Sequence, residues 1–470
     1  MKDTSDRHPS DEGTTRARAS RRLHATDAAA EFVVTVGGFA VLAAVLGICV
    51  YLAWVVVPLF SAGSVEHGEK FDGSGEIVER PSGVYLDPYG EAAILSDSGG
   101  ARVVGLLANE SLGGLDVDGD WGISESSARN GEMIARGFAD GTVRLGSVEF
   151  STKLYAEGDE VEDDGVGYST VLEDGRVRRV TAEESFGEPL KLTDGEGEVV
   201  LVDYQVDPTG KTVLAALRED RTVVVSSVRT TRPLGGGEPR TRLRQTSFML
   251  DGDEDPVGLK VSADGKQVFA VYVDGAMDRY GRERSGFVFR ERVQAIGDGL
   301  TVEVVEMALG GQTVLIGDSN GGVQSWHVAL DERDRFGDGR FLVRSHKFGR
   351  SGVAVVDLTP SSRDRTVGVL YADGVVVLRH LTSEKTIVRI ETGFDLERGA
   401  DGVQHGVVAI GPKNDAVLVY GRGGEYGLWE YEEGYAEFSV KALFGKVVYE
   451  GLPGPEYVYQ SSSGDDASEV

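Results

Sequence analysis

A short string bounded by glycines, Gly317-Asp318-Ser319-Asn320-Gly321, has the residue types of a nucleophile elbow. In that motif the central serine attacks a carbonyl carbon, and it stands on a sharp turn between a strand and a helix. Here strand-like apolar runs lie on both sides, and the string occupies a turn that recurs along the chain. We therefore interpret Ser319 as part of a turn between two strands, and not as a nucleophile.

A second string, Gly210-Lys211-Thr212, has the residues that end a phosphate-binding P-loop. A P-loop needs a further glycine five positions earlier and a helix afterwards. Gln205 stands at that earlier position, no helical pattern follows, and Gly265-Lys266 recurs at the equivalent turn. The string is interpreted as a hairpin turn.

Two groups of alternating aspartates have the spacing of calcium ligands. Neither has the glycine that a calcium loop needs at its sixth position, and Ser127 stands where the first would need a glutamate. We interpret both as solvated acidic loops. The groups are Asp116, Asp118 and Asp120, and Asp251, Asp253 and Asp255.

The histidines have no metal-binding spacing along the sequence. Cys49 is the single cysteine, so the chain can form neither an internal disulfide nor a cysteine metal cluster. We predict no catalytic, cofactor-binding or metal-binding residue and no cofactor, while a metal site assembled from distant histidines stays open. The histidines are His8, His24, His67, His327, His346, His380 and His405.

The charge of the chain is strongly negative and lies downstream of residue 31. The net charge is −29; residues 1–31 carry 6 cationic and 6 acidic side chains, and the rest carries 42 against 71. Such a surface repels nucleic acid, anionic lipid headgroups and free phosphate at long range. It favours solubility or a basic protein partner.

An apolar segment of 29 residues, Phe32 to Phe60, contains no Asp, Glu, Lys, Arg or His. As a helix it would be roughly 43 Å long, which exceeds the roughly 30 Å of bilayer hydrocarbon. We predict a transmembrane helix over 31–61. The alternatives are a buried soluble helix and a signal peptide cleaved near Ser61-Ala62-Gly63, although a signal peptide usually has a shorter apolar region.

The residues around this segment indicate its orientation. Arg21 and Arg22 precede it, whereas the first cation after it is Lys70, and Lys and Arg favour the cytoplasmic side. We therefore expect a single-pass protein of the inner (plasma) membrane, with its N-terminus in the cytoplasm and its main domain periplasmic or extracytoplasmic.

Further residues of the segment suit a membrane anchor. Tyr51 and Trp54 have the types found at membrane interfaces, and Pro58 lies near the end. Ala43 and Gly47, four positions apart, would let another helix approach closely.

From residue 81 onward one unit recurs: an apolar strand, a turn with Pro, Asp or Gly, a second strand, a glycine turn and a third strand. The second turns are 34 to 55 residues apart, and blades of a β-propeller repeat every ~40 to 50 residues. We predict an all-β fold, a WD40-like propeller of seven or eight blades, in which the 34-residue interval could be a stunted blade. These turns fall near Gly99, Gly141, Gly175, Asp220, Gly275, Gly321, Gly374 and Gly424.

The likeness to WD repeats is partial. Trp326-His327 and Trp429-Glu430 fall at the end of a third strand, where WD repeats have their Trp-Asp pair.

The expected domains are a basic/polar tail (1–30), the transmembrane helix (31–61), a linker (62–80), the propeller (81–435) and an exit strand with a C-terminal junction (436–470). The segment after Tyr435 could complete the first blade or act as a stalk.

Both ends of the chain resemble one family. GGFAVLAAVLGICVYLAWVVVPLF, preceded by Arg21-Arg22, is similar to the first membrane helix of large-form permease subunits of Pst-type phosphate ABC transporters. LFGKVVYEGLPGPEYVYQSSSGDDASEV, from Leu443, looks like the junction through which a propeller-like extracytoplasmic insert returns to the permease core. The family's other membrane helices would begin after Val470, so this polypeptide is not expected to be a permease by itself.

The resemblance implies partners and transfers no functional residue. The partners are the remainder of the permease, its sister permease subunit, the ABC ATPase and a periplasmic phosphate-binding protein. We expect a non-enzymatic accessory module of phosphate transport, whose propeller mediates protein contacts. One alternative is an anchored scaffold of another envelope complex; another is a propeller hydrolase or quinoprotein-like enzyme, which would need polar residues converging on the central channel.

Overall fold

The chain divides into two units, Met1–Ser61 and Ala62–Val470. The computed structural model describes residues 32, 34–52, 64–71, 83–97, 100–106, 110–115, 124–130, 133–161, 165–195, 197–207, 211–231, 240–330, 338–396, 406–421 and 425–432.

The first unit contains a helix, Val34–Leu52, that is long and apolar enough to cross a membrane. Its 19 residues correspond to about 28 Å, close to the thickness of bilayer hydrocarbon. Its described side chains are all exposed within the first unit. A signal sequence near the N-terminus would meet the same criteria of length and composition.

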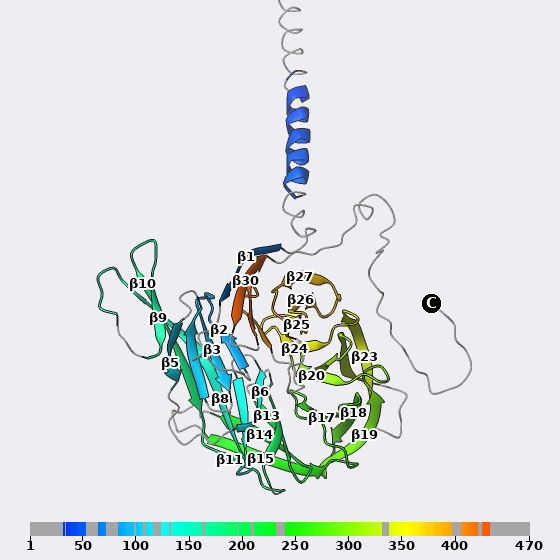
Figure 1. Ribbon diagram of the computed structural model, residues 1–470. Coiled ribbons are helices and arrows are strands. Elements are labelled where there is room, and N and C mark those ends of the chain that lie inside the picture. The colour runs from blue at the N-terminus through cyan, green and yellow to red at the C-terminus, as the bar shows by residue number, and fades with distance from the viewer. Residues whose placement is uncertain are drawn as a thin grey trace, which may run out of the picture. The chain divides into compact units, whose positions relative to one another are not determined.

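The second unit consists of antiparallel sheets, seven of them in the described residues, which we call blades 1 to 7 (Figure 1). Blade 1 contains β2 (Gly83–Leu86), β3 (Ala92–Asp97), β4 (Gly100–Gly105) and β5 (Glu110–Leu115). Blade 2 contains β6 (Ser124–Asn130), β7 (Met133–Phe138), β8 (Thr142–Tyr155), β9 (Gly167–Val171), β10 (Val177–Phe186) and β11 (Leu190–Lys191). Blade 3 contains β12 (Val199–Val206), β13 (Thr212–Arg218), β14 (Thr222–Thr231) and β15 (Arg240–Met249).

The remaining blades follow in chain order. Blade 4 contains β16 (Gly258–Val261), β17 (Gln267–Val271), β18 (Ala276–Arg282) and β19 (Phe287–Gln294). Blade 5 contains β20 (Val302–Met307), β21 (Thr313–Asp318), β22 (Gly322–Leu330) and β23 (Arg340–Gly349). Blade 6 contains β24 (Val355–Pro360), β25 (Thr366–Tyr371), β26 (Val375–His380) and β27 (Thr386–Glu391). Blade 7 contains β28 (Val407–Ile410), β29 (Ala416–Tyr420), β30 (Tyr426–Glu432) and, as its fourth strand, β1 (Ser64–Phe71).

The blades form a closed ring because each sheet is apolar on both faces. In blade 3, Val213 and Val223 face blade 4, whereas Leu214 and Val224 face blade 2. One apolar cluster of this kind lies between each pair of neighbouring blades, and blade 7 packs against blade 1 in the same way. From blade 2 round to blade 7 and on to blade 1, the first strands of successive blades contact one another around the centre. The fold is therefore a seven-bladed β-propeller, which confirms the predicted class and selects seven blades.

The ring is closed by a strand from the start of the second unit. β1 pairs antiparallel with β30, from Ser64 opposite Glu432 to Phe71 opposite Tyr426. The range 62–80, expected to be a linker, thus supplies the outermost strand of blade 7. The segment after Tyr435 lies outside the described residues.

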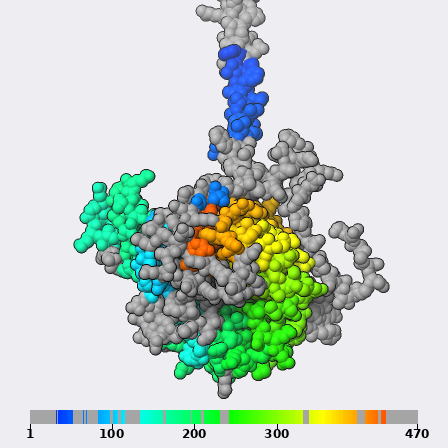
Figure 2. All heavy atoms as spheres, in the orientation of Figure 1, coloured from blue at the N-terminus to red at the C-terminus, as the bar shows by residue number. Residues whose placement is uncertain are grey.

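The unit around Gly175 is not a blade of its own. It forms a hairpin in which β10 pairs along the long strand β8 and β9 pairs with β10, so all three belong to blade 2. We call β9 and β10 the insert; it projects from the rim of the ring (Figures 1 and 2). The eight sequence units therefore make seven blades, and the stunted-blade interpretation is wrong.

Several turn and strand predictions are confirmed. Gly141, Gly275, Gly321 and Gly374 have φ between 75° and 89° at turns between second and third strands, a backbone conformation that favours glycine. Trp326 and Trp429 lie in the third strands of blades 5 and 7, and both are buried between blades.

Candidate functional site

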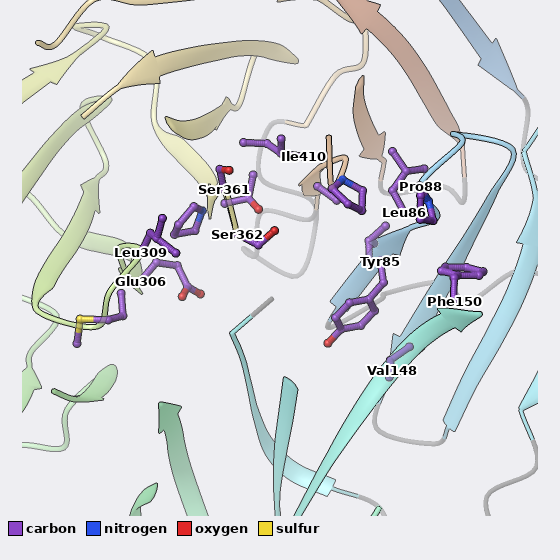
Figure 3. Close-up of a pocket in the computed structure, with 16 residues that line it drawn as sticks. Tyr85, Leu86, Pro88, Val148, Phe150, Glu306, Leu309, Ser361, Ser362 and Ile410 are labelled. Atoms are coloured by element: carbon purple, nitrogen blue, oxygen red, sulfur yellow. The ribbon is translucent and has the colours of Figure 1, made fainter. Parts of the chain in front are cut away.

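A cavity of about 130 Å³ opens at the mouth of the central channel, where the first strands of blades 1, 5, 6 and 7 end. Figure 3 shows Glu306, Leu309 and Ser362 on one side of it, and Tyr85 and Phe150 on the other. The ends of these strands and the turns that follow contribute three prolines to the wall. They are Pro88, Pro360 and Pro412.

Hydrogen bonds within the turns hold this rim in place. The buried carboxylate of Asp87 accepts bonds from the backbone N–H groups of Tyr89, Glu91 and Ala92 at 3.0, 2.7 and 3.0 Å. Such bonds from a side chain to nearby backbone fix a tight turn. The rim of blade 1 is therefore preorganised.

A similar lock joins blades 6 and 7. The hydroxyl of Ser361 donates to Asn414 Oδ1 at 2.8 Å and accepts the N–H of Arg363 at 3.0 Å. Because its donor and acceptor positions are already engaged, Ser361 is a structural residue of the rim.

A buried ion triad forms the channel wall beside the cavity. Lys260 Nζ in blade 4 lies 3.3 Å from Glu306 Oε2 in blade 5 and 3.5 Å from Asp203 Oδ1 in blade 3. Asp203 also accepts the backbone N–H of Val261 at 2.8 Å. One cation thus links the first strands of three consecutive blades.

Burial and charge shape the protonation of this triad. Burial opposes the charge on Lys260, but Glu306 and Asp203 outweigh it and raise the pKa of the ammonium group. Burial also raises the pKa of the Asp203 carboxyl, against the attraction of Lys260. Asp203 is 2% exposed and Glu306 is 22% exposed, so Glu306 is the carboxylate that a ligand in the cavity can reach.

The insert extends the surface around the mouth. Tyr168 donates its hydroxyl proton to Asp87 Oδ2 at 2.6 Å, and Thr170 donates to Glu91 Oε2 at 2.5 Å. Arg178 forms an ion pair with Glu91. Burial and the neighbouring Asp87 raise the pKa of Tyr168, so its hydroxyl keeps the proton that it donates.

Tyr89 lies between two cations beside the mouth. Arg178 Cζ from the insert lies 3.6 Å from its ring centroid, and Lys413 Nζ from blade 7 lies 4.8 Å away. Both contacts are within the range of cation–π attraction. They fasten the insert to the rim of blades 1 and 7.

The geometry of the mouth suits binding of a protein side chain. Small-molecule pockets usually measure about 300–1,000 Å³, well above the 130 Å³ found here. Among the described residues that line the cavity there is one carboxylate, Glu306, and there is no histidine. A preorganised cleft with both polar and apolar walls and one carboxylate can hold an apolar side chain next to a basic one.

A second cleft, of about 350 Å³, lies between blades 5 and 6. His346 Nδ1 lies 3.0 Å from Glu384 Oε1, and His327 Nδ1 lies 3.2 Å from Ser345 Oγ. Burial and the neighbouring His346 lower the pKa of His327. Glu384 contacts His346 and not His327, so the contacts form two pairs and no Ser-His-Glu chain.

Sequence reasoning missed these two pairs because their members come from different turns and strands. No spacing along the chain signals them. The described residues contain no group of three or more His, Cys, Asp or Glu side chains that could hold a metal ion.

The motifs that resemble catalytic sequences are turns, as predicted. Asp318 Oδ1 accepts the N–H groups of Asn320 and Gly322 at 2.9 and 2.8 Å, and Ser319 Oγ accepts the N–H of Thr301 at 3.1 Å. Lys211 lies between β12 and β13, and its N–H donates to Asp207 at 3.0 Å.

The other residues that the sequence singled out lie on the helix, in an exposed loop or outside the described residues. Tyr51, Ala43 and Gly47 lie on the helix and are exposed, and the space where a side chain at Gly47 would lie is open. Their roles in the membrane stay predictions. Asp251, Asp253 and Asp255 lie in an exposed loop. Arg21, Arg22, Trp54, Pro58 and the aspartates at 116, 118 and 120 lie outside the described residues.

No protein-family model matches the chain, and no curated protein matches it. Among solved structures it is similar to the β-propeller domain of Cps50 (Swd1) from Myceliophteria thermophila, with 12% identity and a TM-score of 0.45. The similarity covers 78% of this chain and 99% of that one. The class rests on the sheets themselves: the chain is a seven-bladed β-propeller preceded by an apolar helix.

Proposed function

We propose that this chain is a non-enzymatic, membrane-anchored interaction module whose channel mouth binds a basic segment of a partner protein. The observation that carries the proposal is the mouth itself: a rigid cleft, too small for a typical substrate, in which Glu306 is the reachable charge. The net charge of −29 adds a long-range attraction for basic partners. The Val34–Leu52 helix supports anchoring because its exposed, apolar surface suits lipid.

We further propose that the assembly is a phosphate ABC transporter. The resemblance of both ends of the chain to Pst-type permease subunits supports this assignment. The partners would then be the permease core, its sister subunit, the ATPase and the phosphate-binding protein. The cavity offers no free cation among its described lining residues, so the propeller would bind a protein of the system and not phosphate.

Site-specific cross-linking in cells tests both statements. A photoreactive residue replaces Ser362 at the mouth, and a matched control replaces Asp253, in the loop between β15 and β16 at the opposite end of the strands. The expected result is a discrete adduct with a transporter subunit from position 362 and none from 253. An adduct with an unrelated envelope protein would assign the module to another complex. Equal labelling from both positions would contradict a binding site at the mouth.

A further inference from the structure

The outer part of blade 3 carries three arginines on one face of its last two strands. Arg229 of β14 lies directly opposite Arg242 of β15, and Arg244 follows at the next position on the same face, opposite Ser227. All three side chains are exposed. We call these three residues the arginine patch.

None of the three members of the patch has a carboxylate partner among the described residues. Other arginines of the propeller do: Arg279 lies 2.6 Å from Glu291 and Arg292 lies 2.6 Å from Asp278. Like charges directly opposite on neighbouring strands repel one another. Among the described residues this cluster of positive charge therefore has no paired carboxylate, although the chain contains 77 acidic residues.

The position of the patch indicates the shape of its ligand. β15 is the last strand of its sheet, so one side of its backbone has no strand partner within the described part of the chain. Arg242 and Arg244 are two positions apart, and their side chains therefore point to the same face. A strand added alongside β15 would present alternate side chains to these arginines.

We propose that β15 is a docking edge for an extended acidic segment of a partner protein, which adds as a strand and places carboxylates at alternate positions against the arginine patch. Arginine suits this role because its planar group binds a carboxylate through two parallel hydrogen bonds. At physiological salt, charge is screened beyond roughly 8 Å, so the patch acts locally within an acidic molecule. This surface is separate from the channel mouth, and its occupant has the opposite charge.

The test uses the full chain in nonionic detergent and a fluorescent synthetic peptide in which Glu and Thr alternate. Anisotropy should show salt-sensitive binding. The double substitution R242E/R244E should weaken binding at least about tenfold, because two charge-assisted contacts are replaced by repulsion. R242K/R244K keeps the charge and loses the paired hydrogen bonds, so it should weaken binding by a smaller factor. Circular dichroism confirms that the variants are folded.

Three controls make the result decisive. K266E/K347E makes the same change in net charge at exposed lysines of blades 4 and 5 and should leave binding unchanged. Peptides with all glutamates grouped at one end, or with backbone N–H groups methylated at alternate residues, should bind poorly. Equal loss in K266E/K347E, equal binding of either altered peptide, or no peptide binding would overturn the proposal. Binding of phosphatidylglycerol vesicles without peptide binding would overturn it in favour of a lipid surface.

Discussion

Lys260 is the residue on which the charge balance of the channel depends. It is the cation between two carboxylates, and one of them, Asp203, is almost fully buried. Removal of one member of a buried ion group leaves uncompensated charge and typically costs several kcal/mol. The residue therefore joins three blades electrostatically, in addition to their apolar contacts.

We expect Lys260→Met to lower the free energy of unfolding by about 3 kcal/mol near neutral pH. The defect should shrink at acid pH. Burial raises the pKa of Asp203, so the folded state holds that proton more tightly, and this stabilisation is present below the ordinary pKa and lost as pH rises through the raised value. Without Lys260 the pKa rises further, and the protonated carboxyl replaces the missing ion pair.

Urea unfolding of both proteins at about pH 5 and about pH 8 measures this effect. Lys266→Met, at an exposed lysine of the same blade, provides the control and should change stability by less than about 0.5 kcal/mol. A defect that is the same at both pH values would contradict the coupling to Asp203.

At the scale of elements, Arg178 is one of the contacts that hold the insert against blade 1. This side chain joins the β9–β10 hairpin to Glu91 and Tyr89 of blade 1. Arg176, two residues away in the same hairpin, pairs only with Asp174 of its own turn among the contacts described. The two arginines are a natural matched pair.

We expect Arg178→Ala to weaken the attachment of the insert to blade 1 by roughly 1–3 kcal/mol of free energy. This is the sum expected for a partly buried ion pair and a cation–π contact. Limited proteolysis should then cut between β8 and β9 faster than in the unchanged protein, with little change in global stability. The Arg176→Ala variant should be cleaved at the same rate as the unchanged protein. Equal cleavage of the two variants would show that the insert is not held by Arg178.

Closure of the ring by β1 has its own test at Gly68. The indole of Trp429 lies directly opposite, and a side chain at Gly68 would collide with it. We expect Gly68→Ala to destabilise the propeller by about 1–3 kcal/mol through overpacking. Gly114, in the outer strand of blade 1, has open space where a side chain would lie, so Gly114→Ala should be nearly neutral. Thermal unfolding compares them, and an unchanged midpoint in Gly68→Ala would argue against the closing strand.

The repeats were predictable because their turns are local. Glycines such as Gly275 and Gly321 mark sharp turns that depend on neighbouring residues alone. The same local signal at Gly175 led to the wrong prediction of a stunted blade. An extra hairpin has the same turn pattern as a short blade, and only its pairing with β8 distinguishes the two. The role of β1 was invisible for a related reason: its partner, β30, is more than 350 residues away.

The channel mouth was beyond sequence reasoning. Its residues come from five blades, and no spacing brings Tyr85 together with Glu306. The same holds for the ion triad, in which each of three blades contributes one residue. By contrast, the interpretation of Ser319 and Lys211 as turn residues needed only their neighbours, and it was confirmed.

At the scale of the whole molecule, the excess of negative charge determines which ligands the propeller can bind. The excess of acidic side chains disfavours binding of small anions, and Lys260 is already shared by two carboxylates. We expect the full chain to show no phosphate binding at micromolar concentrations by calorimetry. Sodium chloride at matched ionic strength is the control for heat of dilution. A saturable signal with a micromolar Kd would contradict the proposed role of the propeller as a protein-binding module.

The orientation of the chain is the last property to test, and it belongs to the molecule as a whole. Arg21 and Arg22 precede the apolar segment, and cations favour the cytoplasmic side. After Cys49 is replaced by alanine, single cysteines are placed at Ser10 in the tail and at Ser362 in the propeller. In intact cells a membrane-impermeant maleimide should label Ser362→Cys and not Ser10→Cys, whereas both should react after detergent is added. Labelling of Ser10→Cys alone would reverse the topology, and with it the proposal that the propeller meets its partners outside the membrane.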